Sequence, residues 1–493
     1  MPAPPHPMPP RLRSGVTCDP VARTLDDPRF ARRIKLDDAG LALLSALPEA
    51  TSAEDLAKRA GLELQQVAKW LARLGDLDLL DTPRANGRAA DRAALGVVKA
   101  APAEHLRPLE GARFACTMCG SCCGGHVIGP VSRPILAALE PHLPELEVEV
   151  RAERRVTKGL FFTTPAQRAT PGEDVVCHAA AGSCVFLDDA GLCRIHRKLG
   201  AGMKPLPCRI FPYELTATPS GVRVAIQREC RDFLTATDDH QPALAEALEE
   251  VRAFLPELPQ VPSPTLTPRL RDVQVDRWSD YEDLEVRLLK ACDVAQGARA
   301  EDSFAALAAL LPPASEDPEP SFRAWRDALL APLRQILAAV PRDDAHVVFR
   351  VDALATAVDA LGDARGWVLA RATAPLGADA ARLLSAHLRH AVWSLSPLRA
   401  SSLAAGLGRL HAEWLLAHLV ALGRSRAVKR FHVTTQDLQD GLATANFLFR
   451  HKDLEPLLSR LDPLTTAVFL DAPHTPRVDA DREPDARTEL PKF

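Results

Sequence analysis

Cysteine is the residue type with the clearest chemical pattern in this chain. Nine of the eleven cysteines fall between residues 112 and 235. They are Cys116, Cys119, Cys122, Cys123, Cys177, Cys184, Cys193, Cys208 and Cys230. A gap of two residues between cysteines lets the backbone wrap around a metal and present successive thiolates to one centre. The pattern therefore predicts that these nine thiols bind metal.

The identity of the metal stays open between an iron–sulfur cluster and zinc. Three thiolates in a C-x2-C-x2-C run with a remote partner are the ferredoxin-like way to hold a [4Fe–4S] cluster. A zinc ion that only staples a weakly packed fold is the competing interpretation, and a redox-active dithiol is a third. We favour iron–sulfur over zinc, because this spacing suits a cube better than a tetrahedral ion. Cys122 and Cys123 are adjacent, so one of them serves a second centre or another task.

The later cysteines lie in two recognisable motifs. The segment SCVFLDDAGLCRIH predicts a hairpin, with strands over residues 184–187 and 192–196. In KPLPCRIFPYEL, three prolines fix the chain around Cys208, and a last strand over residues 222–226 ends near Cys230. We expect these motifs to meet the first cysteine run in space.

Several other residues could contribute to a metal site but have a weaker pattern. His196 and Arg209 adjoin the cysteine motifs, and we interpret them as a surface histidine and one half of a surface salt bridge. Cys18 and Cys292 lie outside the cysteine-rich segment and are expected to be bystanders. A metal role is not expected for the four histidines of predicted helices, His387, His390, His411 and His418.

Length and composition exclude several classes of protein. The chain has 493 residues, 47% apolar and 25% charged, with a net charge of −4. These values predict several soluble domains and disfavour a nucleic-acid sponge or a membrane-surface protein. No stretch is long and apolar enough for a transmembrane helix, and the Pro-rich N-terminus does not resemble a secretory signal. We therefore expect a cytoplasmic protein with reduced thiols.

The N-terminal third divides into three predicted parts. Residues 1–32 are expected to be a disordered arm, because they are rich in Pro and Arg. Residues 33–82 predict a winged helix-turn-helix, with a helix from residue 64 to 74 and a wing strand after Gly75. Residues 83–111 are predicted to form a linker.

The rest of the chain divides into four predicted parts. Residues 112–235 form the cysteine domain, and the prolines of residues 236–269 indicate a second linker. Residues 270–470 predict an all-helical domain, and residues 471–493 a flexible tail. The predicted fold class is α+β, mainly helical, with short strands in the cysteine domain.

The cysteine motifs resemble a known family. CTMCGSCC, followed after a long gap by SCVFLDDAGLCRIHRKLG and LPCRIFP, is similar to the YkgJ-type cysteine-cluster proteins, which are described as zinc- or iron-chelating. Among these, the spacing resembles the flagellin lysine N-methylases (FliB-like). LRHAVWSLSP and ATANFLFRH are loosely similar to their helical C-terminal region. Residues 33–82 are similar to PqqD-type modules, which bind peptides beside modifying enzymes.

That resemblance implies methyl transfer from S-adenosylmethionine to protein lysine, with an iron–sulfur cluster held by the matching cysteines. The sequence itself shows neither a Gly-rich adenosyl-binding turn nor the C-x3-C-x2-C spacing of radical enzymes. Deprotonating a lysine requires a base within hydrogen-bond reach, and Glu214 and Tyr213 are the first candidates. Whether the chain is an enzyme stays open.

Three functional hypotheses follow from these patterns. The first is a lysine N-methylase-like enzyme that grips a protein or peptide substrate with its winged module. The second is a non-catalytic zinc- or iron-chelating protein, or an iron–sulfur sensor. The third, a DNA-binding regulator, is disfavoured, because residues 51–75 contain four basic and three acidic residues and so carry a charge of only +1.

Overall fold

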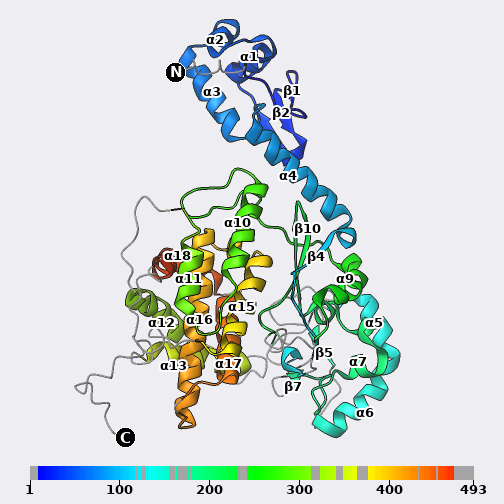
Figure 1. Ribbon diagram of the computed structural model, residues 1–493. Helices are drawn as coiled ribbons and strands as arrows, with labels where there is room; N and C mark the ends of the chain where they lie inside the picture. The colour runs from blue at the N-terminus through cyan, green and yellow to red at the C-terminus, as the bar shows by residue number, and fades with distance from the viewer. Residues whose placement is uncertain are drawn as a thin grey trace, which may run out of the picture.

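The computed structural model places an N-terminal module above a larger body and joins the two through one long helix (Figure 1). It describes residues 9–116, 119–123, 129, 131–154, 161–163, 176–177, 179–180, 183–230, 233, 241–312, 322–339, 348–363, 376–430, 432–450 and 454–470. The chain is mainly helical with small sheets of short strands, which confirms the predicted fold class. In the described part, the helices are too short or too polar to cross a bilayer.

The N-terminal module contains a sheet where a disordered arm was predicted. Strands β1 (Thr17–Asp19), β2 (Thr24–Asp27) and β3 (Arg32–Lys35) pair in that order. Leu25 is buried in the core of the module, and the buried Arg13 donates to the Asp27 carboxylate at 2.7 Å. The expectation of disorder was wrong for the described residues 9–32, because a few apolar side chains and one buried ion pair tie this segment to the helices. Residues 1–8 lie outside the described residues.

Three helices complete the module: α1 (Asp38–Ala46), α2 (Ala53–Ala60) and α3 (Leu64–Asp76). The predicted wing strand after Gly75 is wrong, since that stretch makes only an isolated bridge between Leu80 and Leu12. The sheet that packs on the helices precedes them in the chain.

Helix α4 (Pro83–Ala100) occupies most of the segment that was predicted as a linker. Thr82 caps it by accepting a hydrogen bond from the Ala85 N–H, and Pro83 takes the first helical position. The linker prediction was wrong because these start signals and the many alanines outweigh the two glycines inside the helix.

The central part is built on the sheet β4–β10–β9, formed by Leu106–Pro108, Gly221–Ile226 and Tyr213–Thr218. Strand β10 runs antiparallel to β9 and parallel to β4. Helix α9 (Leu248–Phe254) packs Val251 and Phe254 into the core of this sheet. The predicted linker over residues 236–269 is therefore partly a packed helix.

The cysteine segment adds short elements below this sheet. They are α5 (Arg133–Leu139), α6 (Leu143–Arg154), β5 (Phe162–Thr163), β6 (Val176–Cys177), β7 (Ala179–Ala180), β8 (Ser183–Cys184), α7 (Arg194–Leu199) and α8 (Leu206–Ile210). Their small core contains Val185, Phe186 and Ile195 together with several cysteines.

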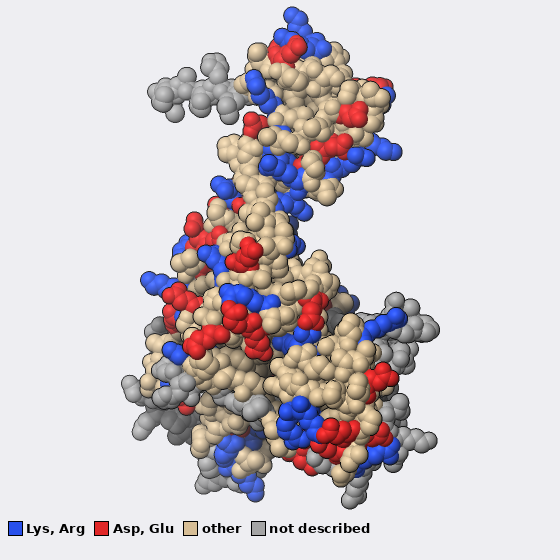
Figure 2. Space-filling model, turned by 90° about the vertical axis from the view of Figure 1, so that its right-hand side faces the viewer, with Lys and Arg blue, Asp and Glu red and all other residues tan. Residues whose placement is uncertain are grey.

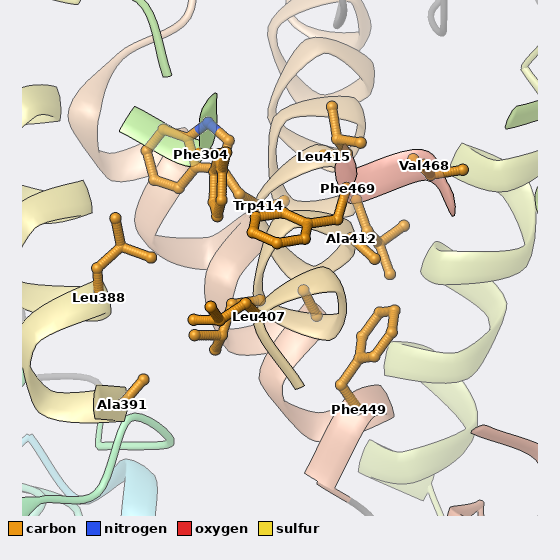
Figure 3. Close-up of a cluster of buried hydrophobic side chains, with 14 of the residues drawn as sticks. Phe304, Leu388, Ala391, Leu407, Ala412, Trp414, Leu415, Phe449, Val468 and Phe469 are labelled. Atoms are coloured by element: carbon orange, nitrogen blue, oxygen red, sulfur yellow. The ribbon is translucent and has the colours of Figure 1, made fainter. Parts of the chain in front are cut away.

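The C-terminal region is helical throughout its described part. Its helices are α10 (Trp278–Ala291), α11 (Ala300–Ala308), α12 (Phe322–Ala339), α13 (Val348–Gly362), α15 (Ala378–Trp393), α16 (Leu403–Ala427), α17 (Thr435–Arg450) and α18 (Glu455–Leu470). Side chains of α11, α15, α17 and α18 pack around α16, where Trp414 is fully buried (Figure 3). Helix α17 begins directly after Thr434, which exchanges hydrogen bonds with Asp437. The predicted tail, residues 471–493, lies outside the described residues.

Candidate metal centre

The first cysteine run lies directly against the later hairpin motif. Gly120 adopts φ +70°, and a Cβ there would stand 3.2 Å from the Gly191 carbonyl oxygen and from Leu187. A larger residue would be strained in this backbone conformation and crowded by the turn. This contact brings the loop between Cys119 and Cys122 onto the segment that carries Cys184 and Cys193.

The motif around Cys184 and Cys193 is a tight turn followed by a helix. The Asp188 N–H donates to the Leu192 carbonyl at 2.9 Å, and the Asp188 carboxylate accepts from the Leu192 N–H. The predicted return strand over residues 192–196 is wrong, because α7 begins at Arg194 with Cys193 as its N-cap residue. Of the predicted hairpin pairing, the described structure retains an isolated antiparallel bridge between Leu187 and Cys193.

Six thiols from separate segments share one cluster, which we call the thiol cluster. Its members are Cys122, Cys123, Cys177, Cys184, Cys193 and Cys208. A hydrogen bond to Cys122, then burial, raises the pKa of the Cys123 thiol well above its ordinary value. A hydrogen bond to Cys184 does the same to the pKa of Cys177. The segments predicted to converge therefore do converge.

Two further members, Cys193 and Cys208, are also shifted toward the neutral thiol. Burial raises the pKa of Cys208, and the charges of Cys184 and Cys193 raise it further against the opposing charge of Lys204. Burial also raises the pKa of Cys193, although the N–H groups of Ile195 and His196 oppose that rise. Buried thiolates that repel one another need a nearby cation to ionise together, and a bound metal supplies that charge.

The other predicted ligands lie at the border of this cluster. Cys116 and Cys119 are exposed, and the charge of Cys116 reaches the Tyr213 hydroxyl. Cys230 is buried in the core of the β4–β10–β9 sheet. Cys18 lies in β1 and Cys292 at the end of α10, both outside the cysteine segment. His196 is exposed, and Arg209 forms an ion pair with Glu257, as expected for each.

The donor chemistry of this region fits zinc or iron. Its thiols are soft ligands that suit zinc and iron–sulfur centres, and all eleven cysteines of the chain are thiols rather than disulfides. In the part of the chain that the structure describes, the side chains are close but do not stand in a finished set of three or more metal ligands. The type of donor atom and the closeness of the thiols therefore fit a zinc or iron site.

Residues 115–232 match the family CxxCxxCC, described as "Putative zinc- or iron-chelating domain". This match covers the whole cysteine segment with its nine predicted ligands. It supports metal binding by this segment, with zinc or iron as the metal. Neither a curated protein nor a solved structure matches the chain.

A buried network of charges joins the cysteine segment to the helical region. The Arg228 guanidinium, two residues before Cys230, donates to the Glu413 carboxylate of α16 at 2.5 Å. His387 of α15 lies 3.2 Å from the same carboxylate. We call this network the junction cluster and define it by Glu214, Arg228, His387, Glu413, Asn446 and Arg450.

Glu214, predicted as a candidate base, belongs to the junction cluster. It accepts from Arg399 at 2.7 Å and from Arg450 at 2.9 Å. Burial raises the pKa of Glu214, but the charges of Arg450 and Arg399 outweigh it and hold the pKa below its ordinary value. A carboxylate held in this way is a poor general base.

Tyr213, the other candidate base, donates to Glu250 at 2.8 Å. Burial and this hydrogen bond raise the pKa of Tyr213 well above its ordinary value. The phenol therefore stays protonated and occupied at neutral pH.

The sequence analysis missed the junction cluster as a site. The available signal was charge on apolar helix faces, since His387 and His390 interrupt one helical stripe and Glu413 interrupts the most apolar stretch of the chain. Four buried atoms of this cluster have no hydrogen-bond partner within the described structure: Glu214 Oε2, Arg228 Nε, His387 Nδ1 and Asn446 Oδ1. Such atoms are uncommon in a purely structural core.

Proposed function

We propose that the chain is a metal-dependent, cytoplasmic protein-modifying enzyme that transfers a methyl group from S-adenosylmethionine to a lysine of a protein. The observation that carries the proposal is the gathering of thiols from separate segments of the chain. The family match supports the metal, and the resemblance of the cysteine spacing to flagellin lysine N-methylases suggests the reaction.

The metal in this proposal is a [4Fe–4S] cluster rather than zinc. The thiol cluster would hold it, with Cys116, Cys119 and Cys230 as further ligands or as ligands of a second centre. When bound, iron–sulfur supplies a redox-active, positively charged centre in a buried position. The protein's own contribution is to keep the thiols close together and reduced, and the cytosol suits the second requirement.

The methyl transfer balances without further reactants. The lysine Nζ lone pair forms the new N–C bond, the C–S bond of the sulfonium breaks, and S-adenosylhomocysteine leaves. One proton is released from the methylated ammonium. Glu214 and Tyr213 are engaged with arginines and with Glu250, so we assign the proton to solvent rather than to either side chain.

The substrate protein is proposed to bind through the N-terminal module. The module stands apart from the body on α4 (Figure 1), with β1 and β3 as the outer strands of its sheet. Outer strands offer backbone groups to an added peptide strand. The PqqD-like character of the module is part of this proposal.

The test is methyl transfer by anaerobically purified, metal-loaded protein. Incubation with S-adenosylmethionine and candidate proteins should add methyl groups to lysine, detected by mass spectrometry. Cys184→Ser should lose the activity, whereas Cys18→Ser, outside the cysteine segment, should keep it. Methylation that is absent with fully loaded protein, or unchanged in Cys184→Ser, would overturn the proposal.

A non-catalytic metal-binding protein, either a zinc or iron chelator or an iron–sulfur sensor, is the second candidate. The observation that favours it is the engagement of Glu214 and Tyr213, the two side chains expected to take a proton. A sensor changes its properties with the oxidation state of the centre and consumes no methyl donor. Metal-loaded protein that binds its partner differently when oxidised, and never methylates it, would favour this candidate.

A further inference from the structure

A cavity of about 550 Å³ lies at the waist between the N-terminal module and the body. Helix α4 forms one wall, Phe30 of the module another, and the segment of residues 263–267 the third. Its volume is typical of ligand-binding cavities. It is distant in sequence from the thiol cluster and shares no residue with it.

The wall formed by α4 is a basic helix face. Arg84, Arg88, Arg92 and Lys99 all line the cavity, at helical spacings that place them on one side. In Figure 2 the surface around the waist carries several Lys and Arg side chains. Positive charge thus gathers where the module meets the body.

These cations are of two kinds. Arg84 and Arg88 form ion pairs with Asp78 and Asp276. Arg92 and Lys99 make no ion pair with any carboxylate in the described part of the chain, and the Arg92 guanidinium lies 5.1 Å from the centre of the Phe30 ring. Two cations in a ligand-sized cavity are therefore available to an external anion.

The distance between Arg92 and Lys99 favours a ligand with two separate negative charges. Seven helical residues at about 1.5 Å each separate Arg92 and Lys99 by roughly 10 Å along the axis. Two carboxylates three residues apart on a peptide in the polyproline II conformation lie on the same face of the peptide, about 9 Å apart. A single phosphate cannot reach both cations.

The acidic residues of the cavity argue against a nucleic acid. Asp76, Asp78 and Asp91 line the same space and would repel a continuous row of phosphates. A peptide places its few carboxylates only where they meet a cation. The hydroxyls of Ser263 and Thr265 at the rim suit hydrogen bonds to a peptide backbone.

We propose that this cavity binds an acidic segment of a partner protein, with carboxylates three residues apart paired to Arg92 and Lys99. The inference rests on the proposed function only in that the segment belongs to the protein to be modified. Binding is measured without turnover, so a failed methylation assay leaves this result unaffected.

The experiment is fluorescence anisotropy with the full-length protein and a capped, labelled Gly-Ser peptide that carries two glutamates three residues apart. Arg92→Gln and Lys99→Gln should each weaken binding about tenfold, which is typical of losing a hydrogen bond between charged groups. The double variant should lose roughly a hundredfold, because the two sites are too far apart to couple strongly. Both residues are exposed, so the fold should be retained.

Two controls make the result specific. Lys69→Gln removes an exposed lysine of α3 outside the cavity and should leave binding unchanged. A peptide with glutamine at both positions should bind at least tenfold more weakly than the glutamate peptide. Equal binding of the two peptides, equal affinity of the double variant and Lys69→Gln, or tighter binding of a single-stranded oligonucleotide at the same residues would overturn the proposal.

Discussion

The cysteine segment and the C-terminal helical region are stabilised in different ways. The helical region buries three tryptophans, Trp278, Trp325 and Trp414, in one continuous core. Around its thiols, the cysteine segment has a small core that includes several cysteines, and the strands there, β5 to β8, are only two residues long. Since each large apolar side chain contributes about 1.5–3 kcal/mol on burial, the helical region can fold on packing alone. We expect the stability of the cysteine segment to depend on the metal that its thiols bind.

Metal removal should separate the two regions most strongly. Structural zinc contributes roughly 10 kcal/mol or more of apparent binding free energy in small domains that depend on it. Chelation is therefore expected to abolish hydrogen-exchange protection in the described residues of 115–232 while α16 stays protected. Cys123→Ser should act in the same direction and Cys18→Ser should not. Uniform loss of protection in both regions would contradict the difference.

The junction cluster should show the next largest effect. Glu413→Ala leaves the buried Arg228 without its carboxylate, and breaking a buried pair in this way costs about 3–5 kcal/mol. Glu455→Ala is the matched control, because Glu455 is half-exposed and Arg409 keeps its pair with Asp462. That loss should stay within about 1 kcal/mol. Urea unfolding measures the loss of stability in each variant. Similar losses in Glu413→Ala and Glu455→Ala would show that the junction cluster contributes no more to stability than a surface ion pair.

Glycine substitutions in α16 and α17 should change the stability of the helical region alone. A Cβ at Gly441 of α17 would stand 2.1 Å from the Ala417 carbonyl oxygen of α16, so Gly441→Ala forces the two helices apart. Overpacking of this kind costs about 1–3 kcal/mol. Gly423→Ala lies on α16 with open space around it and should gain up to about 1 kcal/mol. Thermal unfolding should therefore show a lower midpoint for Gly441→Ala and a higher midpoint for Gly423→Ala. The metal content should be unchanged in each variant.

Acid should weaken the contact between the two regions. Burial lowers the pKa of His390 to about 3, and the neutral ring accepts from the Ile226 N–H at 3.0 Å. Because this pKa is depressed on folding, the stabilisation is complete above the ordinary value of about 6.5 and is lost as the pH falls toward 3. At pH 5 the loss is about 2 kcal/mol.

His390→Asn tests this pH dependence, with the exposed His196→Asn as control. Between pH 7 and pH 5, the free energy of unfolding measured in urea should fall by about 2 kcal/mol less in His390→Asn than in the wild type, and by the wild-type amount in His196→Asn. His387 and His418, whose pKa values are also lowered by burial, contribute to the remaining fall. If the free energy of unfolding of His390→Asn fell as much as that of the wild type between pH 7 and pH 5, groups other than His390 would set the acid sensitivity.

Patterns in the sequence predicted the helical region and the meeting of the cysteines better than the connecting segments. The stripe of Leu384, Leu388 and Ala391 predicts α15 because it repeats at helical spacing over many residues. Residues 17–35 were misjudged because their strands are short and their main tie is the long-range pair of Arg13 and Asp27. No local pattern shows such a pair.

The candidate site also has a part that the sequence predicts and a part that it does not. The C-x2-C spacing is a local pattern that can be recognised in the sequence. The junction cluster instead combines side chains from β9, the turn after β10, α15, α16 and α17. The arginines that engage Glu214 lie more than 180 residues away from it. Its unsuitability as a base therefore becomes apparent only in the folded chain.

The most direct test of the thiol cluster is its metal content. Zinc, iron and acid-labile sulfide should be measured in anaerobically purified wild-type protein and in Cys122→Ser, Cys184→Ser and Cys208→Ser, one from each of three segments. The account predicts iron and sulfide in the wild type and loss of the same centre in all three variants. Full metal content in Cys184→Ser and Cys208→Ser would contradict it, because the first cysteine run would then bind metal alone.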